Sequence, residues 1–142
     1  LVSTAQVGRA SFYRNFTDKE DVLRQENDRL TAQWKQSYDA VEHTAPNELL
    51  VSLLDFYKER SDFYLALYQA GLSGIVLQTL LEQSEITPEM PNAMAYLKSS
   101  IAYMLYGWVV EWMKRGMQES GTELLKMFQA SPHSEISSNR SI

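Results

Sequence analysis

Residues 5–23 read AQVGRASFYRNFTDKEDVL, and this stretch decides the fold. It predicts the end of one helix over residues 1–7, a turn with Gly8 as helix cap, and a short helix over residues 9–15. A long helix follows, because Thr17 and Glu20 have the spacing of a capping box. This order is typical of the second half of a helix-turn-helix DNA reader, in which the later helix enters the major groove. We therefore expect the first part of the motif to precede Leu1.

The rest of the chain predicts an all-α fold. Apolar residues recur at spacings of three and four, and alternating β-branched runs are missing. Breaks are expected at Pro46 and between Thr87 and Pro91. The predicted helices cover residues 17–42, 48–60, 63–70, 74–81, 92–115 and 121–130. Residues 131–142 are polar and Ser-rich, which predicts a mobile tail.

Composition and charge restrict the classes of protein that fit. The chain has 142 residues, of which 44% are hydrophobic, so we expect a single folded unit with its own core. Its net charge is −5, but residues 1–16 contain two arginines and no acidic residue, which leaves −7 for the remainder. A basic start on an acidic body is typical of a small nucleic-acid contact surface attached to a domain that does not touch DNA. The chain has no cysteine, no signal peptide and no run of 18 uncharged apolar residues, so we expect a cytoplasmic protein without a membrane partner.

The same stretch resembles the TetR family of bacterial transcriptional regulators. The resemblance is carried by Phe12-Tyr13, Phe16 and Lys19-Glu20, which keep the family spacing. Two positions differ from the family pattern, because Gln6 stands at the turn glycine and Gly8 at a serine. The resemblance implies a partial DNA-binding domain with its connecting helix over residues 1–42, followed by an effector-binding and dimerisation domain over residues 46–130.

Recognition of a palindromic operator in double-stranded DNA is the expected function of the first segment. By resemblance, Tyr13 and Lys19 contact phosphates, and Lys19 would stand at a helix start that itself favours an anion. Small side chains on the short helix would allow close approach to base edges, and arginines would supply charge. The predicted DNA-binding residues are Arg9, Ala10, Ser11, Tyr13, Arg14, Asn15 and Lys19.

The resemblance also implies a small-molecule site in the helical body. Buried phenols need hydrogen-bond partners, and a cavity with a ligand or water provides them. Aromatic residues at helical spacing are also ordinary core residues, and that alternative stays open. The predicted pocket residues are Trp34, Tyr38, Tyr57, Tyr64, Tyr68, Met94, Tyr103 and Met104. No buried charge is predicted among them, so the expected effector is small and apolar or aromatic, and no cofactor is expected.

Homodimerisation is predicted from the long helix that begins near Asn92. This helix is apolar on two faces, and both faces need to be covered. One face can pack within the chain, and the other can meet a second copy across a two-fold axis, unless the preceding N-terminal helix covers it. The predicted interface contains Tyr106, Val110, Met113, Met117, Leu124, Met127 and Phe128.

Enzymatic activity is not predicted. His43 and His133 are the only histidines and are far apart in sequence, so neither a metal site nor a histidine-dependent catalytic group is expected. Ser73-Gly74 lacks the flanking pattern of a nucleophile elbow. An alternative to the regulator is a helical dimer with a degenerate DNA-binding head that acts through protein–protein contacts. Gln6 and Gly8 are the residues that keep this alternative open.

Overall fold

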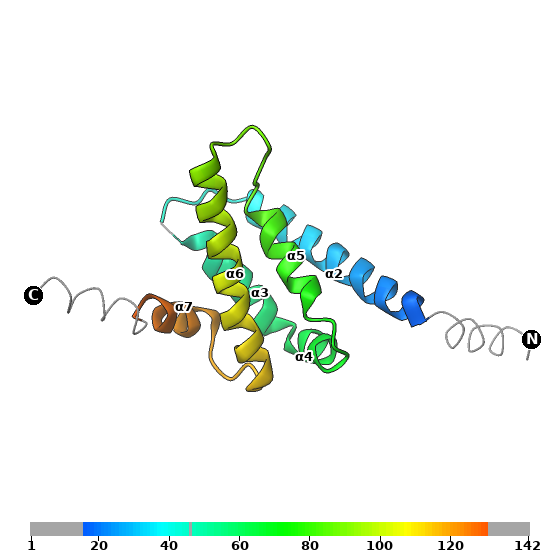
Figure 1. The fold of residues 1–142 in the computed structure, drawn as a ribbon. Helices are drawn as coiled ribbons and strands as arrows, with labels where there is room; N and C mark the ends of the chain where they lie inside the picture. Colours follow the sequence, from blue (N-terminus) through cyan, green and yellow to red (C-terminus); the bar gives the residue numbers. More distant parts are fainter. Residues whose placement is uncertain (1–15, 46, 131–142) are drawn as a thin grey trace, which may run out of the picture.

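The computed structural model describes residues 16–45 and 47–130, and within these ranges the chain is all-helical (Figure 1). Prolines, glycines and short polar segments separate the helices, as the sequence predicts. The helices are α2 (Phe16–Asp39), α3 (Glu48–Glu59), α4 (Ser61–Gln69), α5 (Gly74–Gln83), α6 (Asn92–Lys114) and α7 (Gly121–Gln129). The short helix expected over residues 9–15 and the tail expected over 131–142 lie outside the described residues.

Helix α2 ends at Asp39, three residues before the predicted end at Glu42. His43 folds back and its Nε2 atom lies 2.7 Å from the carbonyl oxygen of Tyr38. That carbonyl belongs to the last turn of the helix and also accepts a hydrogen bond from the N–H of Val41 at 3.3 Å, so the histidine is its second partner. Val41 consequently lies beyond the end of the helix, and 63% of its surface is exposed.

A short reversal joins α4 to α5, and it explains why α4 ends where the sequence predicts. Gly71 has a φ of 77°, which is a left-handed conformation that glycine adopts without strain. The N–H of Leu72 donates to the carbonyl of Leu67 (3.0 Å), and the N–H of Gly71 donates to that of Tyr68 (2.9 Å). These are the two bonds of a Schellman motif, which satisfies the free carbonyls at a helix end.

The ends of α6 and α7 differ in detail from the predicted ones. The N-cap residue of α6 is Pro91, and Asn92 is already the first residue of the helix. Helix α7 has a side-chain cap, because the Ser120 hydroxyl accepts a hydrogen bond from the N–H of Glu123 at 3.1 Å. Between them the chain reverses at Gly116 and Met117, both with positive φ.

The core lies where α3, α4, α5, α6 and the second half of α2 meet. Helix α3 packs against α7 on one side and against α2 on the other, while α6 covers α4 and α5. The largest fully buried side chains are Tyr57, Tyr64, Leu67, Met113, Met117, Val76, Val109 and Asn27. Across residues 16–45 and 47–130, no helix combines the length and apolarity needed to span a bilayer.

Candidate functional site

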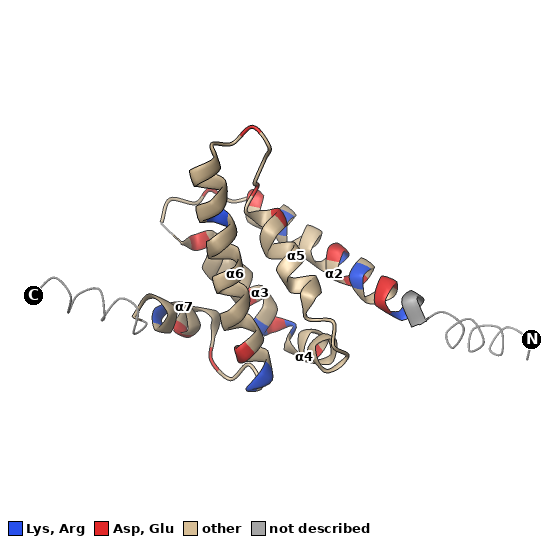
Figure 2. Ribbon diagram, viewed as in Figure 1, with Lys and Arg blue, Asp and Glu red and all other residues tan. Residues whose placement is uncertain are grey.

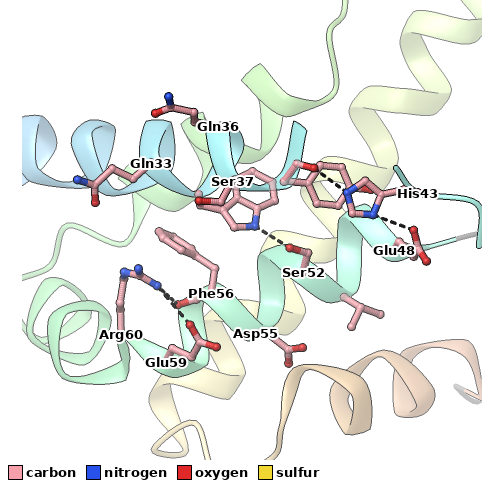
Figure 3. A pocket seen from close by; sticks show the side chains of 13 residues that line it. Gln33, Gln36, Ser37, His43, Glu48, Ser52, Asp55, Phe56, Glu59 and Arg60 are labelled. Carbon is pink, nitrogen blue, oxygen red and sulfur yellow. Dashed lines mark hydrogen bonds and ion pairs between the residues drawn. The ribbon is translucent and has the colours of Figure 1, made fainter. Parts of the chain in front are cut away.

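A groove with a volume of about 840 Å³ lies between α2 and α3. Figure 3 shows α2 along one side of it and α3 along the other, with the end of α2 and His43 closing one end. Its size is within the range of small-molecule sites. The groove is open to solvent along its length, so a ligand can enter without unfolding either helix.

Aromatic rings form the floor of this groove. Trp34 comes from α2 and Phe56 from α3, with ring centroids 6.0 Å apart, and Tyr38 continues the row 5.9 Å from Trp34. The Trp34 indole N–H donates to the Ser52 hydroxyl at 2.8 Å, so the polar edge of the ring is satisfied. The spacing of four between Trp34 and Tyr38 places both on one face of α2.

Each end of the groove holds a basic side chain between an aromatic ring and a carboxylate. At one end the Arg60 guanidinium lies 4.4 Å from the Phe56 ring centroid and pairs with Glu59 at 3.6 Å. At the other end the His43 ring stacks on Tyr38 with centroids 3.7 Å apart, and its Nδ1 atom lies 2.9 Å from Glu48. Both arrangements hold a planar side chain against a ring beside an acid (Figure 3).

Of the eight predicted pocket residues, only Trp34 and Tyr38 line this groove. Tyr57 and Tyr64 fill the core, Tyr68 is half-buried against it, and the other three belong to the outside of α6. The structure does not bring Met94, Tyr103 and Met104 to this groove, because they lie exposed on α6, and the effector site itself stays a prediction. The charged lining residues were missed, since Glu48, Asp55, Glu59 and Arg60 look like ordinary polar helix positions in the sequence.

A buried polar cluster ties α2 to the body beside the groove. The Tyr64 hydroxyl donates to Asn27 Oδ1 at 2.7 Å, and Asn27 Nδ2 donates to the Thr79 hydroxyl at 3.1 Å. The side-chain amide of Asn27 thus joins three helices, α2, α4 and α5. The sequence indicated the tyrosine but not its partner, because Asn27 reads as one more polar residue of α2.

The neighbouring Tyr57 hydroxyl is buried and has no hydrogen-bond partner within the described part of the chain. Its ring meets the Tyr64 ring edge-on at 4.7 Å. Burial raises the pKa of Tyr57 well above its ordinary value of 10.0, and the nearby Tyr64 raises it further. Burial also raises the pKa of Tyr64, against smaller opposing effects of Thr31 and Arg60.

The outward side of α6 exposes an unusual number of large apolar side chains. We call this set the α6 outer face, and its members are Met94, Tyr96, Leu97, Ile101, Tyr103 and Met104, each between 44% and 68% exposed. Lys98 is the single charged residue between Asn92 and Val110, and its ammonium donates to the Ser84 carbonyl instead of facing outward. Figure 2 shows charges gathered on α2 while most of α6 carries none.

The predicted dimer interface is only partly exposed. Met113, Met117 and Leu124 are buried in the core of a single copy, which corrects the expectation that they face a partner. Tyr106 is half-buried, with its hydroxyl 3.1 Å from that of Ser73. Val110 is also half-buried, Phe128 packs edge-on against Trp108 at 5.4 Å, and Met127 is 51% exposed. The buried side of α6 runs through Ala102, Val109, Trp112 and Met113, whereas the sequence left open which of the two apolar faces is covered.

Among the predicted DNA-binding residues, Lys19 lies exposed in α2, and Arg9, Ala10, Ser11, Tyr13, Arg14 and Asn15 fall in the part that the structure does not describe. The described residues contain no group of three histidine or carboxylate side chains placed to hold a metal ion. No protein-family model, curated protein or solved structure matches this chain.

Proposed function

We propose that this protein is a dimeric transcriptional regulator that binds a palindromic operator in double-stranded DNA in the cytoplasm. In this proposal it acts as a repressor whose DNA binding is modulated by a small apolar or aromatic effector in the helical body. The observation that carries the proposal is the stretch over residues 5–23, with its resemblance to the TetR family. The end of this stretch forms the first residues of α2. A DNA-binding head built from the stretch would therefore be continuous with the helical body.

The geometry of α2 supports this arrangement. Its N-terminal end extends beyond the other helices (Figure 1), whereas Asn27, Thr31 and Trp34, from the middle of the helix onward, are buried against the body. Because α2 is anchored at one end and projects at the other, it can transmit a movement of the other helices to a DNA-binding head that precedes it. The groove and the buried polar cluster both contact the anchored half of α2.

The α6 outer face supports the dimer. Contiguous exposed apolar residues on one helix are uncommon on monomeric proteins and are typical of interaction surfaces. An uncharged face suits a second copy of itself, because a two-fold axis brings identical residues together without placing like charges opposite each other. A dimer would present two heads, as a palindromic operator requires.

The alternative is a helical dimer that acts through protein contacts. The α6 outer face does not separate it from the regulator, because both would dimerise through that face. A selection from random DNA duplexes separates the two, using the protein with any residues that precede Leu1 in its natural form. We expect recovery of a palindrome with half-sites about one helical turn apart. Recovery of no sequence by a folded dimer would overturn the DNA-binding proposal and favour the alternative.

Substitution of Lys19 tests how the recovered DNA is bound. We expect Lys19→Ala to weaken binding to all sequences alike and to lower the slope of log affinity against log salt by about one. The matched control is Lys126→Ala, which removes an equal charge from an exposed position of α7. Equal salt slopes for the two variants would contradict a phosphate contact at Lys19.

A further inference from the structure

We propose that the α6 helices of two copies pack against each other in antiparallel directions through the α6 outer face, with Ser100 on the two-fold axis. The partner of this surface is then a second copy of the chain in one defined orientation. This orientation rests on the dimer of the proposed function, and it fixes which residues meet across the interface. The apolar character of the face alone does not fix them.

A row of small residues runs along the middle of the α6 outer face. Ala93, Ser100 and Gly107 follow one another at intervals of seven residues, so they lie on one side of the helix, and all three are exposed. No atom lies within 4 Å of the position that a Cβ would take at Gly107. A second helix can approach this row closely, because the distance between packed helices depends on the size of the side chains at the contact.

Large apolar side chains form a ridge on each side of this row. Helical spacing places Leu97 and Met104 on one side of Ser100. It places Tyr96 and Tyr103 on the other side, and the four large side chains are between 50% and 68% exposed. An antiparallel two-fold arrangement brings each ridge against its own copy, so aliphatic side chains meet aliphatic ones and tyrosines meet tyrosines. The small row lets the helices approach until these ridges touch.

Ser100 can be covered without leaving its hydroxyl unsatisfied. The hydroxyl donates to the carbonyl oxygen of Tyr96, one turn earlier in the same helix, at 2.8 Å. A hydroxyl that is already bonded loses little when water is removed from it. The centre of the row can therefore become dry when a second copy covers it.

Charges at the two ends of α6 select the antiparallel direction. Lys114 and Arg115 stand at its C-terminal end, with side chains 62% and 81% exposed, and they share the one carboxylate of Glu111. Glu85 and Glu89 lie exposed in the segment before α6. Figure 2 shows red in the loop that leads into α6 and blue at the far end of the helix. A parallel pair would place two basic ends side by side, whereas an antiparallel pair places each basic end beside the acidic segment of the other copy.

Disulfide cross-linking tests the orientation, because the chain has no cysteine and each single variant carries one thiol. Identical residues of an antiparallel pair meet only at the axis, so we expect Ser100→Cys to form a covalent dimer under mild oxidation. It should link at least about tenfold faster than Val41→Cys, an exposed position outside α6. Ala93→Cys and Gly107→Cys should link poorly when each is alone. An equimolar mixture of these two variants should form the mixed dimer, because the two residues face each other.

A charge exchange tests the ends of the helices without any thiol. We expect Arg115→Glu to raise the dimer dissociation constant by about threefold or more, since it places an acid beside an acidic segment. Glu89→Arg should have a similar effect, and the combined variant should return to within about twofold of the unsubstituted protein. Glu42→Arg is the matched control, because it reverses the same charge at an exposed position outside α6. Sedimentation equilibrium measures all four constants.

Linking of Ser100→Cys no faster than that of Val41→Cys would overturn the antiparallel interface. Self-linking of both Ala93→Cys and Gly107→Cys would do the same, because it indicates a parallel pair, and so would additive losses in the combined charge variant. The two proposals fail separately. A dimer that selects an operator but does not link at Ser100 keeps the regulatory function and loses this interface, whereas an antiparallel dimer that selects no DNA does the reverse.

Discussion

Two tyrosines that touch each other in the core have opposite hydrogen-bonding states. The Tyr64 hydroxyl donates to Asn27, and the Tyr57 hydroxyl has no partner among the described residues. Both rings contribute to the same aromatic cluster around Phe56. Since the rings are alike, substitution by phenylalanine isolates the hydroxyl at each position.

Tyr64→Phe is expected to lower the free energy of unfolding by about 1–3 kcal/mol, because it leaves the side-chain oxygen Oδ1 of Asn27 buried without a donor. Tyr57→Phe is expected to leave the free energy unchanged or to raise it, since the hydroxyl that it removes is buried and unpaired. Urea denaturation of both variants at one pH provides the comparison. Equal losses in the two variants would show that the hydroxyls are equally well bonded.

Alkaline pH is expected to destabilise the fold through the same residues. Burial raises the pKa of both phenols above the ordinary value of 10.0, so the unfolded chain loses these protons first. The two phenols make their full contribution to the free energy of unfolding below about pH 10, and this contribution is lost as the pH rises toward the raised pKa values. We expect the free energy of unfolding to fall above that pH by at most about 2.7 kcal/mol per pH unit for two protons.

Tyr57→Phe should reduce this slope, because it removes one of the two groups. Tyr103→Phe is the matched control, since the Tyr103 side chain is 54% exposed. Denaturation midpoints measured from pH 8 to pH 11 would give the slopes. A slope that is the same in Tyr57→Phe and in the unsubstituted protein would contradict the assigned role of the buried phenols.

At the scale of the helices, the contact between α3 and α7 depends on one glycine. A Cβ atom added to Gly121 would stand 2.7 Å from the backbone nitrogen of Asp55 and 3.0 Å from the carbonyl carbon of Leu54. These are backbone atoms, so they cannot move aside as a flexible side chain would. Gly107, by contrast, is exposed inside α6 and has no atom within 4 Å of such a Cβ.

Gly121→Ala is therefore expected to destabilise the protein by about 1–3 kcal/mol, because α7 has to move away from α3. Gly107→Ala is expected to stabilise it by up to about 1 kcal/mol, since alanine is the better helix former. Thermal or urea unfolding of both variants would show effects of opposite sign. A neutral Gly121→Ala would mean that α7 does not pack closely on α3.

Helix positions could be predicted from the sequence, but the direction in which α6 faces could not. Proline and glycine mark most of the breaks, and Gly71 ends α4 as expected. Large apolar residues lie on both sides of α6, because Trp112 and Met113 are buried with Ala102 and Val109 whereas Leu97 and Tyr103 are exposed. Periodicity shows that a helix has two apolar faces, yet only tertiary packing decides which one is covered.

The groove was predicted in part for a similar reason. Trp34 and Tyr38 could be assigned from their spacing on one helix, whereas the opposite wall depends on how α3 lies against α2. The break at residues 40–47 brings His43 back onto Tyr38, and no periodic pattern encodes such a return. Charged residues of α3 become lining residues only through this long-range arrangement.

At the scale of the whole molecule, the α6 outer face is expected to join two copies. A helix of 23 residues is about 35 Å long, which suffices for a substantial part of the roughly 800 Å² per partner that stable interfaces bury. Replacing Leu97 and Ile101 by lysine would place like charges at the two-fold axis, where they repel each other. We expect the unsubstituted protein to sediment as a dimer at micromolar concentration and the double variant to sediment as a monomer.

Under the proposed function, a single dimer interface would also constrain the operator. If two copies meet along α6, the two α2 helices project from fixed positions, and DNA half-sites have to match the distance between them. The Leu97→Lys, Ile101→Lys variant should then lose cooperative binding to a full palindrome while it keeps weak binding to a half-site. Val41→Lys is the control, because Val41 is equally exposed but lies outside α6. A variant that is monomeric in sedimentation and still binds the palindrome with full affinity would show that the α6 outer face serves another partner.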